Sequence, residues 1–93
     1  MRIITYPTHQ IVLYMGQKIE VPLWVKYIAV LPHEFGNNSS SLIGFSHKPI
    51  LTKNGIWTIK YGKGKVQEEI GIIRNFKPAP NDIYATLSEV LKP

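Results

Sequence analysis

The residues of this chain best suited to chemistry form a short loop of glycine and lysine, Tyr61–Lys65 (YGKGK). Glycine lets backbone N–H groups approach a phosphate closely, and lysine supplies the positive charge that attracts one. Lys60, Lys63 and Lys65 therefore form a candidate site for nucleic acid or another anion. The spacing is not that of a Walker A loop. The alternative is a hairpin turn whose lysines contact only solvent and protect a sheet edge from aggregation.

Aromatic residues supply a second kind of candidate contact. Trp57 and Tyr61 flank the lysines and are candidate surfaces on which bases could stack. Since Trp57 lies on an alternating strand, its simplest alternative is a core position. Trp24 follows Pro22 in an irregular segment, where it is either a core residue or an exposed anchor of a protein interface.

The histidines and the absence of cysteine argue against metal or thiol chemistry. His9, His33 and His47 are not arranged as HxxxH or HExxH, so their spacing does not predict a metal site. The chain has no cysteine, which excludes disulfides, iron–sulfur clusters and thiol catalysis. We expect no metal and no cofactor.

The carboxylates and serines do not form a catalytic arrangement either. Glu68 and Glu69 are neighbours on a predicted strand, so they face opposite sides and cannot act as a carboxylate pair. The serines at 39–41 lack the GxSxG context of a nucleophile, although His47 could reach one of them. The sequence therefore predicts a protein that is not an enzyme.

Alternation of apolar and polar residues predicts that β-strands position these groups. Strands are expected at Arg2–Tyr6, His9–Met15, Lys18–Pro22, Tyr27–Leu31, Leu42–His47, Ile56–Tyr61 and Val66–Ile73. Turns are expected at Gly16-Gln17, Asn54-Gly55 and Gly62–Lys65. In the last strand, strict alternation would place Ile70 and Ile72 on the same face.

The end of the chain changes its period and predicts a helix over Asn81–Leu91. Its apolar residues recur at i, i+1, i+4, i+7 and i+8, the pattern of one helical face. These residues are Ile83, Tyr84, Leu87, Val90 and Leu91. The helix would cover the open face of the sheet or bind a partner subunit. The expected fold class is thus α+β: a small, mainly antiparallel, curled or barrel-like sheet with one C-terminal helix.

Length and charge limit the class of protein. A chain of 93 residues predicts a single domain over 1–93. A domain of this size buries only about 60–65% of its unfolded surface, so a homodimer is one expected route to stability. The net charge is +5, and seven basic against two acidic residues in Lys48–Lys77 make this segment +5 by itself. This charge favours an anionic partner or serves solubility.

Nothing in the sequence predicts secretion or a membrane span. The first residues lack the long apolar run of a signal peptide, and no segment has about 20 consecutive apolar residues. Together with the absence of cysteine, this favours a reducing, cytoplasmic location without a membrane partner.

A set of residues in Lys18–Trp57 resembles a small accessory domain encoded by phages and prophages, with the pattern IxVPxW, AV, GFxxKP and GxW. The matching residues are Ile19, Val21, Pro22, Trp24, Ala29, Val30, Gly44, Phe45, Lys48, Pro49, Gly55 and Trp57. The resemblance implies a cytoplasmic protein of the host cell that modifies host machinery or blunts host defence by binding a host protein.

The chain departs from that pattern at the loop Leu31–Ser41, which is longer and contains His33 and Phe35. Together with Trp24 and the lysine hairpin, this loop is the expected surface for a host protein. A nucleic-acid-binding β domain, which would use the basic segment Lys48–Lys77, is the alternative function.

Overall fold

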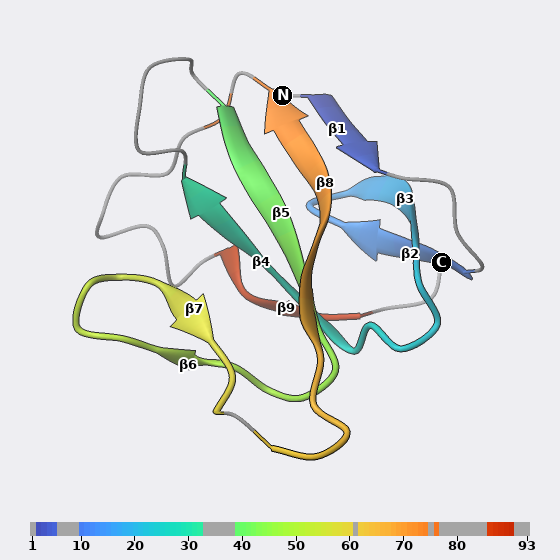
Figure 1. Ribbon diagram of the computed structural model, residues 1–93. Helices are drawn as coiled ribbons and strands as arrows, with labels where there is room; N and C mark the ends of the chain where they lie inside the picture. The colour runs from blue at the N-terminus through green and yellow to red at the C-terminus, as the bar shows by residue number, and fades with distance from the viewer. Residues whose placement is uncertain are drawn as a thin grey trace.

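The computed structural model describes residues 2–5, 10–32, 39–60, 62–74, 76 and 86–90, and in this part the strands are the only extended regular elements (Figure 1). The strands are β1 (Arg2–Thr5), β2 (Gln10–Tyr14), β3 (Gln17–Val21), β4 (Tyr27–Pro32), β5 (Ser39–Phe45), β6 (Ile50–Leu51), β7 (Trp57–Thr58), β8 (Gln67–Arg74) and β9 (Ser88–Glu89). The expected antiparallel β-structure is therefore confirmed.

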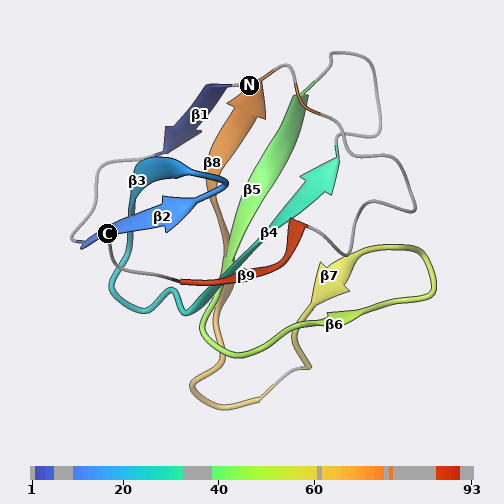
Figure 2. The same cartoon turned by 180° about the vertical axis from the view of Figure 1, so that it is seen from behind.

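A five-stranded antiparallel sheet with the order β1-β8-β5-β4-β9 curls into a half-barrel. Two hairpins, β2–β3 and β6–β7, form separate two-stranded sheets. In Figures 1 and 2 the two hairpins lie on opposite sides of β5. Each hairpin contributes to a different hydrophobic cluster.

The two clusters form because β4 is apolar on both faces. Ile28 and Val30 join the β2–β3 hairpin in the first cluster, while Ala29 between them joins the second. Trp57 of the β6–β7 hairpin belongs to this second cluster, together with Phe45 of β5. A strand covered on both faces shows a continuous apolar run instead of clean alternation. Such a run is observed in β4.

A β-bulge in β8 changes which of its residues share a face of the sheet. Leu42 pairs with Gly71 and Ile43 pairs with Glu69, so Ile70 is an extra residue without a partner on β5. As a result Ile70 and Ile73, three positions apart, both lie in the first cluster. The expectation that Ile70 and Ile72 share a face is wrong, because the bulge reverses the alternation.

The hairpin turn between β2 and β3 lies one residue earlier than the sequence indicates. Met15 and Gly16 both have positive φ, at 49° and 76°, and β3 begins at Gln17. Two consecutive left-handed residues form the type of two-residue turn whose twist matches that of the flanking strands. Met15 is the only non-glycine residue with positive φ among the described residues.

The predicted C-terminal helix is wrong, and with it the α+β class: the described part of the chain is nearly all β. Ser88–Glu89 is strand β9, which pairs with Tyr27 and Ile28 at the edge of β4. Leu87 packs against the second cluster and Val90 against the first. A helix would place residues three apart on one face, whereas an extended chain places them on opposite faces. Residues 81–85 and 91 of the predicted helix lie outside the described residues.

Candidate anion-binding cleft

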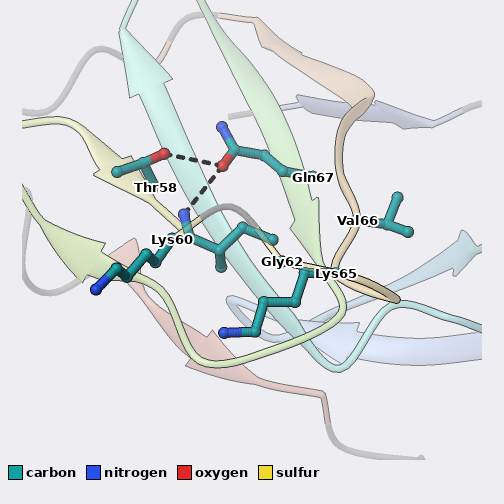
Figure 3. Close-up of a pocket in the computed structure, with 7 residues that line it drawn as sticks. Thr58, Lys60, Gly62, Lys65, Val66 and Gln67 are labelled. Atoms are coloured by element: carbon teal, nitrogen blue, oxygen red, sulfur yellow. Dashed lines mark hydrogen bonds between the residues drawn. The ribbon is translucent and has the colours of Figure 1, made fainter.

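A cleft of about 430 Å³ lies between the end of β7 and the start of β8 (Figure 3). It is lined by Thr58, Ile59, Lys60, Gly62, Lys65, Val66 and Gln67. The volume lies within the range of small-ligand sites in proteins. Gly62 and Lys65 of the predicted lysine loop are part of this lining.

Gln67 links the β6–β7 hairpin to the main sheet across the cleft. Its Oε1 atom accepts hydrogen bonds from the backbone N of Ile59 and from Oγ1 of Thr58, each at 3.1 Å (Figure 3). Gln67 pairs with Phe45, and directly opposed residues of an antiparallel pair share a face. Its side chain therefore points toward the hairpin. The Gln67 side chain thus connects the β6–β7 hairpin to β8 without backbone pairing between them.

This arrangement also fixes the orientation of the Gln67 amide. The backbone N–H of Ile59 can only donate, so the atom that faces it must be the oxygen. The two N–H groups of Gln67 Nε2 then point elsewhere, and they make no hydrogen bond within the described part of the chain. They are suitable donors for an anionic ligand.

The loop at 62–65 places Lys65 at the edge of the cleft. The backbone N of Lys65 donates to the carbonyl oxygen of Gly62 at 3.1 Å, and Gly64 has a φ of 79°. A Cβ atom on Gly62 would lie 3.2 Å from Cδ of Lys65, so glycine leaves room for the lysine stem. In Figure 3 the side chains of Lys60 and Lys65 extend in the same general direction, away from Gln67.

The lysines keep their charges available to a ligand. Lys60, Lys63 and Lys65 are exposed, and within the described residues no carboxylate pairs with them. Glu68 and Glu69, the nearest acidic residues in sequence, are also exposed and lie opposite two consecutive residues of β5, so they face opposite sides of the sheet. Ammonium groups at the edge of a concave site, with no carboxylate partner among the described residues, suit an oxyanion.

Ser46 extends the pairing of β5 with β8 by one residue and contacts Val66, which lines the cleft. The backbone N of Ser46 donates to the carbonyl oxygen of Val66 at 2.9 Å, and the backbone N of Val66 donates to Oγ of Ser46 at 2.7 Å. Ser46 Oγ also lies 2.8 Å from Nδ1 of His47. The serine that contacts His47 is thus Ser46 and not one of the serines at 39–41. Its hydroxyl helps hold the two strand ends together.

The predicted site residues that the structure describes fall into two groups, the lysines and the tryptophans. Lys60 and Lys65 line the cleft, and Lys63 lies in the exposed turn beside it. Trp57 is only 9% exposed, so it occupies the core and offers no open face to a base. Trp24 is partly buried and packs against the first cluster. The other predicted site residues, His33, Phe35 and Tyr61, lie outside the described residues.

Sequence reasoning missed Thr58 and Gln67, although both line the cleft. Each is an uncharged polar residue in a predicted strand. The spacing of such residues in a sequence does not indicate a binding site. Only their mutual hydrogen bond, at 3.1 Å, shows that they act together.

The described residues include no group of three or more histidines and carboxylates that could hold a metal ion. In the same part of the chain, no helix is long and apolar enough to cross a membrane. Comparison of the chain with protein-family models, with curated proteins and with solved structures found no match.

Proposed function

We propose that this protein binds the phosphate backbone of nucleic acid through the cleft between β7 and β8. The observation that carries the proposal is the position of Lys60 and Lys65 at a concave site, where they have no carboxylate partner within the described residues. Gln67 lines the same cleft, and the N–H groups of its amide make no hydrogen bond within the described residues. Lysine ammonium groups and uncharged N–H donors are the usual partners of phosphate oxygens.

The distribution of charge supports a ligand with several phosphates. Lys48, Lys53 and Lys63 are exposed and belong to the same basic segment as the cleft lysines. Positive charge spread over this segment attracts a polyanion and speeds its association. A single small anion would use only the cleft itself.

The test is fluorescence anisotropy with labelled oligonucleotides of mixed sequence, measured from roughly 50 to 300 mM salt. The logarithm of the affinity should fall linearly with the logarithm of the salt concentration, by about 0.7 to 0.9 for each phosphate neutralised. The double variant Lys60→Glu/Lys65→Glu should bind at least about tenfold more weakly and with a shallower salt slope.

A matched control separates the cleft from net charge alone. Lys18 and Arg74 are exposed residues of β3 and β8, and Arg74 lies at the end of β8 remote from the cleft. The variant Lys18→Glu/Arg74→Glu changes the net charge by the same amount. It should retain most of the affinity. An equal loss of oligonucleotide affinity in both variants, or no binding by the wild type at low salt, would refute the proposal.

A protein partner is the second candidate function, and the turn Pro22–Val25 favours it. Leu23 is 61% exposed there, next to the partly buried Trp24. The turn is held by a 3.1 Å hydrogen bond from Val25 N to the Pro22 carbonyl, which also accepts a 2.7 Å bond from Gln10 Nε2. Tryptophan is enriched at the hot spots of interfaces, so Trp24 is the candidate anchor, and Leu23 extends the exposed apolar surface beside it. The phage resemblance points to a host protein as the partner.

This second candidate is tested by affinity capture from a bacterial lysate with the wild type and with Leu23→Ser. A captured protein counts as support only if its purified form binds the wild type and binds Leu23→Ser at least about fivefold more weakly. Binding that is unchanged by Leu23→Ser, or no reproducible capture, would count against this surface.

A further inference from the structure

We infer that the ligand of the cleft is single-stranded nucleic acid, whose bases cover an apolar strip formed by Ile50 and Ile56 on the outer face of the β6–β7 hairpin. This inference rests on the proposed function and adds to it the strandedness of the ligand and a second contact surface. The strip is exposed: Ile50 is 63% and Ile56 is 41% accessible.

The register of the hairpin places the strip on the same face as part of the cleft. Ile50 pairs with Thr58, and Leu51 pairs with Trp57. Paired residues of antiparallel strands share a face, and successive residues alternate between faces. Since Leu51 and Trp57 face the second cluster, Ile50 and Thr58 must face outward. Thr58 also lines the cleft, so Ile50 is the cross-strand neighbour of a cleft residue.

The same alternation extends along the second half of the hairpin. Ile56, Thr58 and Lys60 are alternate residues, and consecutive members of such a series lie about 7 Å apart where the chain is extended. The apolar end of the series is held in place by the turn. Thr52 N donates to the Ile56 carbonyl at 2.9 Å, and Ile56 N donates to Thr52 Oγ1 at 3.2 Å. Ile56 thus lies at the turn end of this series and Lys60 at its cleft end, with Thr58 between them.

A single strand is the form of nucleic acid that fits both parts of this surface. A duplex keeps its bases stacked inside and presents mainly phosphates, so it would contact lysines and leave the isoleucines in water. A single strand can turn its unstacked bases toward the protein while its phosphates stay on a basic groove. Aromatic side chains usually receive the bases at such sites, and here exposed isoleucines would take their place. Isoleucine offers apolar contact without hydrogen-bonding groups, so the site should tolerate different base sequences.

The experiment compares three labelled probes of about 12 nucleotides, a length within the site sizes of single-strand-binding domains. The probes are a mixed-sequence single strand, the corresponding blunt duplex, and an abasic strand with the same number of phosphates. The wild type should bind the single strand more tightly than either of the others. The variant Ile50→Ser/Ile56→Ser should lose about tenfold in affinity for the base-containing single strand. It should bind the abasic strand unchanged.

The control variant Ile11→Ser removes a comparably exposed apolar side chain (51%) from β2 and should leave all three affinities unchanged. The variant Lys60→Glu/Lys65→Glu should have lower affinity for all three probes. Equal affinity for abasic and base-containing strands, preference for the duplex, or no effect of the isoleucine variant would overturn this inference and leave the basic cleft standing. Failure of the wild type to bind any probe would overturn the proposed function as well.

Discussion

The hydroxyl of Tyr14 donates a hydrogen bond to the carbonyl oxygen of Thr86, 72 positions later in the chain, with 2.5 Å between the two oxygens. Both residues are almost fully buried. Thr86 also uses Oγ1 to accept the backbone N–H of Val30 at 3.3 Å, and Val90 N donates to the Lys26 carbonyl at 2.8 Å. These bonds fasten the C-terminal segment to the edge of β4.

Removing the Tyr14 hydroxyl should therefore loosen this segment. Tyr14→Phe keeps the ring in the core but takes a buried donor from the Thr86 carbonyl, and should lower the free energy of unfolding by about 1–2 kcal/mol in urea titrations. Tyr27→Phe is the control, because its hydroxyl makes no hydrogen bond within the described residues. If the two variants are equally stable, the Tyr14 bond does not hold the segment.

Burial of Tyr14 also predicts how stability depends on pH. Burial raises the pKa of its phenol above the ordinary value of 10.0. Below that value both states keep the proton. Above it the unfolded chain loses the proton while the folded chain retains it, so Tyr14 makes stability fall by up to about 1.4 kcal/mol per pH unit.

The comparison of wild type with Tyr14→Phe isolates this effect. The variant lacks the phenol, so its stability deficit should shrink as the pH rises above 10 in urea titrations. A deficit that stays constant from about pH 8 to 11 would show that the phenol titrates alike in both states.

The turn between β2 and β3 is a site where one substitution should stabilise the fold. Met15 has a φ of 49°, so its backbone conformation is unfavourable, and its side chain, 36% exposed, belongs to neither hydrophobic cluster. Met15→Asn creates the Asn-Gly pair that this turn favours, and should raise the free energy of unfolding by about 0.5–1 kcal/mol. Met15→Val should lower it, because a branched side chain tolerates positive φ poorly. Thermal unfolding of both variants checks the prediction.

Gln67 should have separable structural and binding roles. Gln67→Glu retains an oxygen for Ile59 N and Thr58 Oγ1 but places negative charge in the cleft. Stability at pH 7 should change by less than about 0.5 kcal/mol, while affinity for oligonucleotides should fall at least about tenfold. Gln67→Ala removes the acceptor and should cost about 0.5–1.5 kcal/mol.

Hydrogen exchange at the Ile59 amide gives the structural readout for these variants. Gln67→Ala should speed its exchange, and Gln67→Glu should not. Unchanged affinity of Gln67→Glu would show that the ligand does not enter the cleft near this residue.

Local patterns predicted most strands and the turns that join them. The alternation of Ile19 and Val21 with charged residues indicates β3, and Asn54-Gly55 marks the turn of the β6–β7 hairpin. The concentration of lysine after Trp57 indicated the side of the molecule where the cleft lies. Each of these signals lies within a few residues, where backbone sterics and side-chain period act directly.

The C-terminal segment was mispredicted because its apolar spacing satisfies a helix locally. The spacing of Leu87 and Val90 suits one helical face, but the two side chains pack on opposite faces of the sheet, which only an extended chain permits. No neighbouring residue in the sequence indicates that the edge of β4 has unpaired backbone groups with which this segment can pair. That edge, and the buried hydroxyl of Tyr14, belong to strands more than 50 positions away.

The sequence by itself thus determined that this chain builds β-strands, where several turns fall and where positive charge accumulates. The tertiary structure alone decided which strands pair, that β8 contains a bulge at Ile70, and that the last segment becomes a strand. It also decided that Gln67 bridges two elements and leaves a cleft between them. The reason is physical: period and turn geometry are local properties, whereas pairing depends on which edges and faces distant segments leave uncovered.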